Sequence, residues 1–208
     1  MHTELAKVGA PNNLVQILPE PATKDATQAL MRQADLVVAT GSQANVRAAY
    51  SSGKPAFGVG LGNVAVIVDA SADVDDAARK ICASKCFDNA TSCSSENSLV
   101  IVDAVWDSML ASLARAGGVL LSAPEKARLQ GAMWHAGNLS PAVMARPLGD
   151  IVKAAGLGNG FAQAKFLMVE DSGTGKAHPF SGEKLSLVLT LYRVKDFDAA
   201  FEQVRSIY

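Results

Sequence analysis

Short apolar runs alternate along this chain with segments of helical spacing, and this alternation limits the possible folds more than any other feature. A run such as 35–39 (DLVVA) is short and rich in valine, which favours a buried strand. Strands that are joined through helices pair in parallel, because each helix returns the chain to the same end of the sheet. The alternation therefore predicts an α/β fold around a parallel sheet. We expect strands at 14–18, 35–39, 55–59, 64–69, 98–103, 165–169 and 187–193, and helices at 24–33, 43–51, 74–87, 105–115 and 196–207.

Polar residues stand where several of these helices are expected to begin. Thr23 and Asp73 each precede a helical segment, and Ser122 with Glu125 fits a capping box. Such side chains accept hydrogen bonds from the first free amides of a helix. We expect Lys85 at a solvated helix end. The last helix is expected to bury an apolar stripe of Phe197, Ala200, Phe201 and Val204.

A glycine-rich link, GVGLGN at 58–63, is the most plausible domain boundary, and it divides the chain into 1–60 and 61–208. The N-terminal part has about three expected strands, fewer than the about five or six of a complete doubly wound sheet. The link does not fit a dinucleotide fingerprint, since its third glycine comes one residue early and a β-rich run follows it. A structural crossover and a loop lining an active site both remain open.

The charge balance excludes some functions. The 208 residues include 19 Lys and Arg and 20 Asp and Glu, which gives a net charge of −1. No excess of positive charge points to nucleic acid or an anionic membrane. The apolar runs are far shorter than the about 20 residues that span a bilayer, and the N-terminus lacks a signal-peptide core. We therefore expect a cytoplasmic protein without nucleic-acid or membrane partners.

A second glycine-rich stretch, GTGK at 173–176, fails as a phosphate-binding P-loop at two positions. Glu170 stands where the motif needs glycine, and Ala177 replaces the metal-binding hydroxyl. We expect a flexible, solvated loop at 171–184.

The three cysteines differ in their surroundings. Cys82 and Cys86 fall in or beside the apolar stripe of a helix, where cysteine acts as a small core residue. Their spacing, without a nearby histidine, does not suggest a metal site. Cys93 lies in a polar turn before a strand, where backbone amides can stabilise a thiolate or an oxyanion. From these surroundings alone, a nucleophilic role and an incidental loop position are both open for Cys93.

The segment around Cys93 is similar to a family motif. Lys85–Val102 reads KCFDNATSCSSENSLVIV and resembles the pattern K-x-F-D-N-x-x-x-C-x-S-E of CoA-acylating aldehyde dehydrogenases, members of the aldehyde dehydrogenase superfamily. The segments 39–63 and 179–200 are similar to two further blocks of this family, in the same order. The resemblance implies a three-layer α/β catalytic domain at 61–208, whose completeness it leaves open, preceded at 1–60 by the last part of a Rossmann-like cofactor domain.

The resemblance also implies roles for individual residues. Cys93 matches the catalytic nucleophile, and its backbone N–H would help to hold the oxyanion. The implied cofactor is NAD or NADP, with CoA as a co-substrate and no metal. The cofactor site is expected to include Gly41 and Ser42 at a helix start facing the phosphates, Gly60 of the link, Glu183 at the nicotinamide ribose, and Leu185 against the nicotinamide.

Hydrolytic members of the superfamily carry a general-base glutamate where this chain has Val59. Without that carboxylate, a thioester on Cys93 is expected to react with CoA rather than with water. The expected reaction converts an aldehyde, CoA and NAD(P)+ to an acyl-CoA and NAD(P)H. A hydrolytic dehydrogenase that makes free acids is the less favoured alternative.

The C-terminal block is most similar to enzymes that act on sulfoacetaldehyde, and enzymes that act on succinate semialdehyde are the nearest alternative. Either substrate carries an anionic group, for which Arg146, Lys184 or His135 could supply the cation. Leu187 departs from the family, where proline is usual, and this is expected to affect a loop.

Family members are considerably longer than this chain, which resembles their middle part. We expect a homo-oligomer, a dimer or a tetramer, that binds a small aldehyde and CoA. The competing hypothesis is a truncated homologue that is catalytically incompetent or serves as an interaction module, because the first half of the nucleotide fold is missing from the match.

Overall fold

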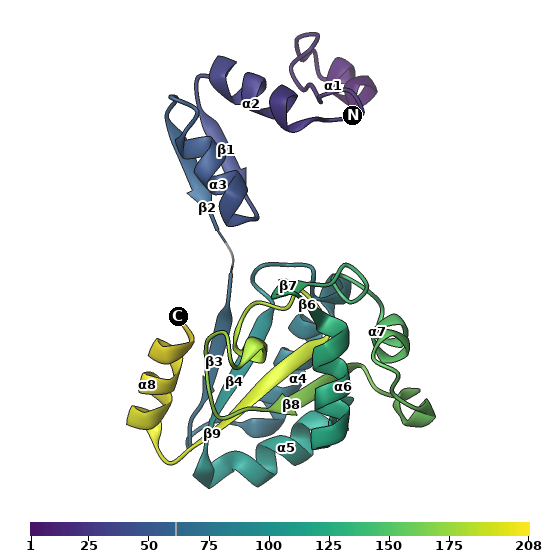
Figure 1. The fold of residues 1–208 in the computed structure, drawn as a ribbon, viewed down its shortest axis with the longest axis vertical. Helices are drawn as coiled ribbons and strands as arrows, with labels where there is room; N and C mark the ends of the chain where they lie inside the picture. The colour runs from purple at the N-terminus through teal and green to yellow at the C-terminus, as the bar shows by residue number, and fades with distance from the viewer. Residues whose placement is uncertain (61) are drawn as a thin grey trace. The chain divides into compact units, whose positions relative to one another are not determined.

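The structure of the protein is a computed structural model that describes residues 1–60 and 62–208. The chain divides into two compact units, Met1–Leu61 and Gly62–Tyr208, and each is described by itself (Figure 1).

The first unit contains a small parallel sheet. Its two strands pair with Val37 opposite Ala56, and the helix between them makes the crossover. Val37 is buried on the face that this helix covers, whereas Val38 and Phe57 on the other face are 69% and 65% exposed. Parallel sheets are usually covered on both faces, so this unit has the layout of part of a larger α/β layer. The elements are α1 (His2–Lys7), α2 (Lys24–Gln33), β1 (Val37–Thr40), α3 (Gln43–Tyr50) and β2 (Ala56–Val59).

The strand expected at 14–18 is wrong. These residues are irregular and mostly exposed, and β1 and β2 pair only with each other. An apolar run becomes a strand only where a neighbouring strand satisfies its backbone groups. The first unit therefore has two strands rather than three among its described residues.

The second unit is built on a five-stranded sheet in the order β3-β4-β9-β8-β5, and all of its pairings are parallel. This confirms the predicted α/β class with a parallel sheet. The strands are β3 (Val64–Val68), β4 (Glu96–Val102), β5 (Gly118–Leu120), β8 (Phe166–Glu170) and β9 (Val188–Val194), and a short hairpin joins β6 (Trp134–His135) to β7 (Asn138–Leu139).

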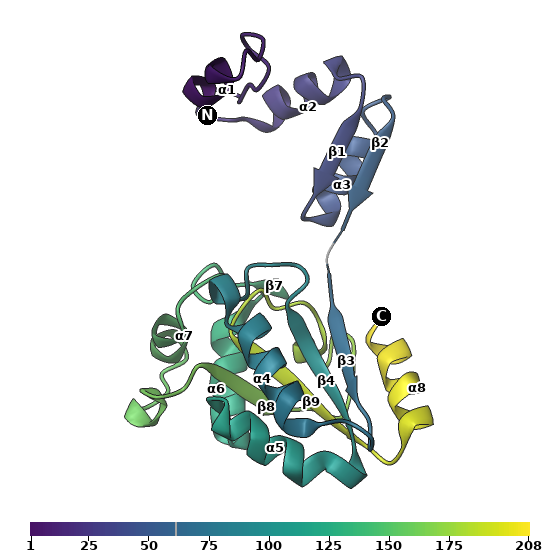
Figure 2. The same cartoon turned by 180° about the vertical axis from the view of Figure 1, so that it is seen from behind.

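Helices cover both faces of the five-stranded sheet and give three layers (Figures 1 and 2). Alternate residues of the inner strand β4 contribute to the two cores: Leu99 and Ile101 pack in the large core with α4, α5, α6 and α7, whereas Val100 packs with Ala200 of α8. A strand buried on both faces reads as a continuous apolar run, as 99–102 does. The helices are α4 (Val74–Lys85), α5 (Trp106–Arg115), α6 (Ala123–Met133), α7 (Leu148–Ala154) and α8 (Phe197–Ile207), with single 3-10 turns at Phe87–Ala90, Asp103–Val105, Asn159–Phe161 and Pro179–Ser181.

The predicted helix starts are confirmed. The side chain of Thr23 accepts a hydrogen bond from the Ala26 amide, that of Asp73 accepts one from Asp76, and Ser122 with Glu125 forms the capping box.

Two burial predictions are wrong. Lys85 is 1% exposed instead of solvated, because its ammonium group finds a partner inside the protein. In α8, Ala200 is buried, but Phe197 and Phe201 are 54% and 53% exposed. The apolar stripe of α8 is therefore wider than the part of this helix that packs on the sheet.

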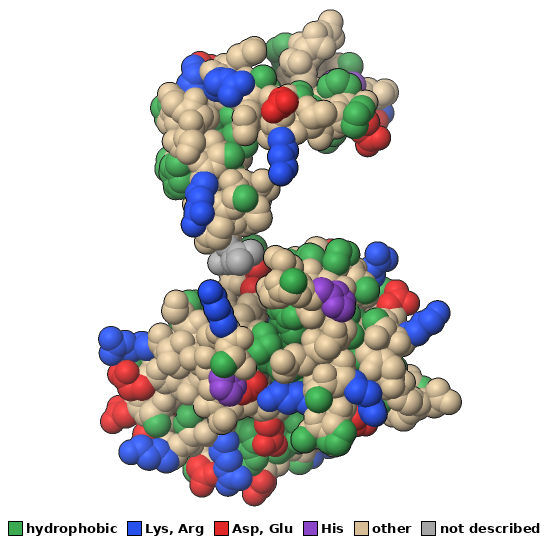
Figure 3. Space-filling model, in the orientation of Figure 1, with side chains coloured by type: hydrophobic (Ala, Val, Ile, Leu, Met, Phe, Trp, Pro, Cys, Tyr) green, Lys and Arg blue, Asp and Glu red, His purple; other side chains and the backbone are tan. Residues whose placement is uncertain are grey.

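Charged side chains of both signs are interspersed on the visible face of the second unit (Figure 3), as the near-zero net charge suggests. None of the helices in the described residues combines the length and the apolar character needed to cross a membrane.

Candidate active site

Cys93 lies in the turn between α4 and β4, the strand that pairs with β3 and β9, and it is the exposed cysteine of the three. Before it, Asp88, Asn89 and Ala90 have positive φ angles of 47°, 53° and 58°. Left-handed backbone is tolerated by Asp and Asn but costs an alanine roughly 1 kcal/mol. Such conformations persist only where the surroundings enforce them, and they cluster at functional sites.

Hydrogen bonds hold this left-handed segment and the turn after it. The Thr91 amide and hydroxyl donate to the Asp88 carbonyl at 3.0 and 2.5 Å. The Ser95 amide donates to the Ser92 carbonyl at 3.0 Å. Within the described part of the chain, the Cys93 N–H makes no hydrogen bond, so this donor can serve a ligand at the thiol.

Gly62 lies between the thiol turn and Glu183. A Cβ atom at Gly62 would overlap the Cys93 carbonyl oxygen and would lie 3.3 Å from the carbonyl carbon. The Gly62 N–H donates to the Glu183 carboxylate. The structure thus brings together Cys93 and Glu183, which stand 90 positions apart at the amino ends of the neighbouring strands β4 and β9.

Glu183 is half-buried, and this burial raises the pKa of its carboxyl group above the usual value. Leu185, two residues further on, has a φ of 42°, and its carbonyl accepts a hydrogen bond from the Ala145 amide at 2.7 Å. The segment that carries both residues is therefore fixed to the rest of the unit.

The other cofactor candidates belong to the first unit. Ser42 caps α3 by accepting a hydrogen bond from the Asn45 amide, and Gly41 before it has a φ of 106°. A Cβ atom at Gly60 would lie 2.8 Å from Nε2, the side-chain amide nitrogen of Gln43. A helix start directly after a parallel strand suits an anionic phosphate, so Gly41 and Ser42 fit this part of a dinucleotide.

Two buried lysines support the second unit from inside. The Lys85 ammonium group donates to the Glu96 carbonyl at 2.8 Å, and that of Lys184 donates to the Phe180 and Gly182 carbonyls at 2.7 and 3.0 Å. Burial lowers the pKa of Lys85 to about 7 and the pKa of Lys184 well below its usual value.

Lys184 is 0% exposed, so the expectation that it could bind an anionic substrate is wrong. Its ammonium group donates hydrogen bonds to the backbone carbonyls of Phe180 and Gly182 instead. Arg146 and His135, the other two candidates, are exposed.

Because Lys85 is buried, we expect the stability of the protein to depend on pH. Its pKa is about 7 in the folded chain, against 10.5 ordinarily, so the unfolded chain binds more protons between these values. The free energy of unfolding is therefore expected to rise from pH 7 to pH 9, by up to about 1.4 kcal/mol per pH unit from this group. The raised pKa of Cys86, about 12 against 9.0, opposes this rise as the pH approaches and passes 9, where the thiol of the unfolded chain loses its proton. Urea unfolding of wild type and Lys85→Met at pH 7, 8 and 9 checks the slope.

In Lys85→Met, the slope of the free energy of unfolding against pH is expected to fall by the contribution of about one proton. The buried Lys184 accounts for the slope that remains. Lys80→Met is the matched control, because Lys80 lies on the same helix with its side chain 69% exposed. Equal slopes in Lys85→Met and wild type would contradict the assignment.

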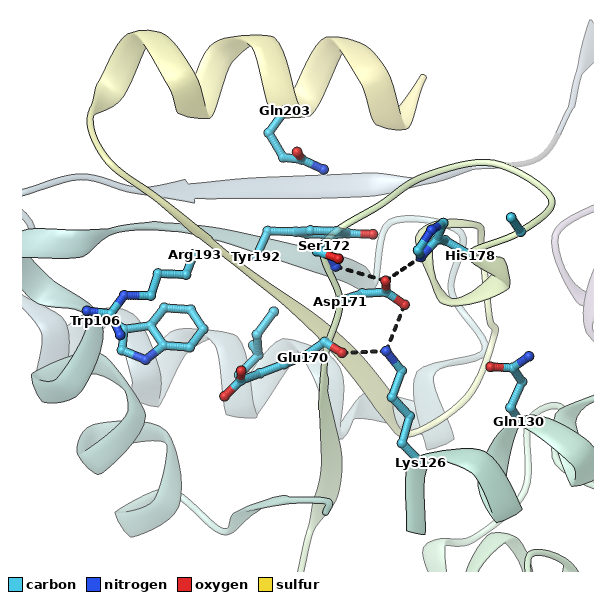
Figure 4. A pocket seen from close by; sticks show the side chains of 12 residues that line it. Trp106, Lys126, Gln130, Glu170, Asp171, Ser172, His178, Tyr192, Arg193 and Gln203 are labelled. Carbon is cyan, nitrogen blue, oxygen red and sulfur yellow. Dashed lines mark hydrogen bonds and ion pairs between the residues drawn. The ribbon is translucent and has the colours of Figure 1, made fainter. Parts of the chain in front are cut away.

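The loop expected to be flexible at 171–184 is instead held by hydrogen bonds (Figure 4). The Asp171 carboxylate binds the Lys126 ammonium group at 2.9 Å and His178 Nδ1 at 2.6 Å. The Gly175 amide donates to Ser181 Oγ at 3.0 Å. These polar partners, rather than an apolar pattern, order the loop, and periodicity does not reveal them.

A pocket of about 570 Å³ opens beside Asp171. Residues at the carboxyl ends of the strands line it, including Glu170 and Arg193, whereas Cys93 precedes the amino end of β4. Because the strands are parallel, the pocket and the thiol lie at opposite ends of the sheet. The pocket is therefore not the site of the thiol chemistry. Among the described residues, no group of three or more His, Cys, Asp or Glu side chains could hold a metal ion.

Residues 1–140 match the model of the aldehyde dehydrogenase family. This match extends over more than half of the chain, and the parallel α/β fold with an exposed thiol before the inner strand β4 agrees with it. The chain belongs to the aldehyde dehydrogenase family.

Individual proteins show which members of this family the chain is similar to. The chain is 61% identical to a sulfoacetaldehyde dehydrogenase (acylating) from Cupriavidus necator, over 100% of this chain and 42% of that protein. An acetylating aldehyde dehydrogenase from Geobacillus thermoglucosidasius superposes with a TM-score of 0.95 at 35% identity, over 99% of this chain and 46% of that one. A propionaldehyde dehydrogenase from Rhodopseudomonas palustris, solved with bound CoA and an acylated cysteine, has a TM-score of 0.89 at 29% identity, over 99% and 47%. The chain therefore spans less than half of the length of these relatives.

Proposed function

We propose that this chain forms the thiol-bearing part of a CoA-acylating aldehyde dehydrogenase, in which Cys93 attacks the aldehyde and Glu183 helps to hold a nicotinamide cofactor. The observation that carries the proposal is the exposed Cys93 beside Gly62, whose N–H donates to the Glu183 carboxylate. The likeness to acylating relatives supports it, including one whose structure holds CoA and an acylated cysteine.

In the first step the Cys93 thiol loses its proton to water, and the thiolate Sγ forms a bond with the aldehyde carbon. The carbonyl oxygen becomes an oxyanion, and the Cys93 N–H, which has no hydrogen-bond partner among the described residues, can stabilise it. A bound nicotinamide cofactor supplies the acceptor for the hydride. Loss of that hydride would leave a thioester on Cys93. Attack by the CoA thiol would then move the acyl group to CoA and return the proton of that thiol to Cys93.

The fate of the thioester depends on which nucleophile can be activated. Val59, at the end of β2, stands where hydrolytic members carry a general-base glutamate, and a valine side chain cannot deprotonate water. Transfer to CoA is therefore favoured over hydrolysis. A helix start at Gly41–Ser42 and the Glu183 carboxylate fit the phosphates and a ribose hydroxyl of the cofactor.

Sulfoacetaldehyde is the substrate that we favour, on the 61% identity to the relative from Cupriavidus necator. A sulfonate needs a cation, and Arg146 is the candidate that we prefer. It is exposed, and it follows Ala145, whose amide donates to the Leu185 carbonyl at 2.7 Å. Succinate semialdehyde, whose carboxylate makes the same demand, is the alternative.

The test is aldehyde oxidation by the purified chain, with NAD+ or NADP+ and with or without CoA. We expect acyl-CoA formation with sulfoacetaldehyde, little free acid without CoA, and a higher KM for sulfoacetaldehyde, but not for acetaldehyde, in Arg146→Ala. Free acid formed at a comparable rate without CoA would favour a hydrolytic dehydrogenase. Calorimetric titration that shows no binding of NAD+ or NADP+ would favour the catalytically incompetent homologue.

A further inference from the structure

Asn97 is a buried polar residue on β4, four positions after Cys93 and 3% exposed. Its Oδ1 accepts a hydrogen bond from the Lys184 backbone N–H at 2.9 Å. Its Nδ2 donates to the Ser95 carbonyl at 3.4 Å. One side chain therefore contacts the end of the thiol turn and the residue next to Glu183.

The hydrogen bond from the Lys184 amide to Asn97 Oδ1 extends the contact between β4 and β9 beyond their backbone pairing. The ladder between β4 and β9 begins with Ser98 opposite Thr190. Toward the amino ends, Cys93 and Glu183 lie on two separate connecting segments. The Asn97 side chain joins these segments at the level that the ladder does not reach.

The segment that carries Glu183 is held by further hydrogen bonds. The Lys184 ammonium group donates to the carbonyls of Phe180 and Gly182, and Thr190 Oγ1 donates to the Phe180 carbonyl at 2.7 Å. The place of this segment relative to the thiol turn then depends on the contacts between the two, and the Asn97 bond to the Lys184 amide is one of them.

We propose that Asn97 is a positioning residue that sets the place of Glu183 relative to the Cys93 thiol through the Lys184 amide. The proposal rests on the proposed function of Cys93 and Glu183. Reaction rates depend steeply on such placement, and a displacement of about 1 Å can cost roughly 100-fold in rate. Asn97 itself contacts neither substrate nor cofactor in this role.

Three variants test the proposal. Asn97→Leu keeps the number and branching of the side-chain heavy atoms and removes the acceptor, whereas Asn97→Asp keeps an acceptor for the Lys184 amide. Ser98→Ala is the matched control, because Ser98 is the next residue on β4, is 0% exposed, and its hydroxyl has no hydrogen-bond partner in the described residues. If Asn97→Leu does not fold, Asn97→Ser replaces it, since the shorter side chain cannot span the same distance.

Two measurements are made on each variant: the steady-state constants for acyl-CoA formation, and the rate of Cys93 alkylation by iodoacetamide, followed on the Cys93 peptide by mass spectrometry. We expect Asn97→Leu to lose about tenfold or more in kcat with the KM for CoA unchanged, and to alkylate about threefold more slowly because the turn amides are less well aimed. Asn97→Asp keeps the acceptor but loses the donor to Ser95 and buries a carboxyl group, so we expect it to recover only part of the loss. Ser98→Ala is expected to stay within about twofold of wild type in both.

The two proposals fail in different ways. Absence of aldehyde oxidation in wild type overturns the proposed function, and the alkylation rates then still decide the role of Asn97. Wild-type kcat and alkylation in Asn97→Leu would overturn the positioning role. The positioning role would also be overturned if Asn97→Asp were as impaired as Asn97→Leu, because the acceptor that aspartate keeps would then fail to restore the rate.

Discussion

Replacing Cys93 by alanine is expected to lower the rate of acyl-CoA formation by roughly 1,000-fold or more, because in the proposed mechanism the Cys93 thiol carries the acyl intermediate. The fold should survive the change. The Cys93 side chain is exposed in a turn, and the bonds that hold this turn come from Thr91, Ser92 and Ser95. The measurement is acyl-CoA formed with aldehyde, CoA and NAD(P)+, together with a urea unfolding curve.

Cys82→Ala supplies the control for this prediction. Cys82 is 8% exposed in the large core, and its thiol donates to the Ala116 carbonyl at 3.2 Å. This variant should therefore lose stability, by about 1 kcal/mol, while keeping its activity. The catalytic assignment is wrong if Cys93→Ala retains wild-type activity, and loss of activity in Cys82→Ala alone would point to the core instead.

Local patterns predict much of this fold because their causes are local. The caps at Thr23 and Asp73 bond to amides three residues away, so sequence spacing suffices to find them. The burial of β4 follows in the same way from its continuous apolar run. The strand expected at 14–18 fails because a strand also needs a neighbour, and no local pattern says whether one is present.

The candidate site depends more on distant contacts. Cys93 could be found from its polar turn and its motif, and the pair Asp88–Asn89 hints at left-handed backbone, since these residue types tolerate it best. Asn97 could not be found, because its partner Lys184 lies 87 positions away. The same reason explains the error at Lys85, whose bond to the Glu96 carbonyl is invisible to helical periodicity.

Gly62→Ala is expected to impair both stability and activity, because the added methyl group meets backbone rather than a movable side chain. The new Cβ would overlap the Cys93 carbonyl oxygen, so either the turn or the link must shift. Overpacking of this kind costs about 1–3 kcal/mol. The Gly62 N–H also binds the Glu183 carboxylate, so any shift of the link moves Glu183 relative to the thiol.

We therefore expect Gly62→Ala to lose about 100-fold in kcat for acyl-CoA formation, together with a lower free energy of unfolding in urea. Gly131→Ala is the matched control, since Gly131 lies inside α6 and a Cβ there meets nothing within 4 Å. An alanine in that helix should raise stability by about 0.4–1 kcal/mol and leave kcat unchanged. If Gly62→Ala were as active as Gly131→Ala, the link would not control the geometry of the thiol, and the close approach of Gly62 to Cys93 would be a matter of packing alone.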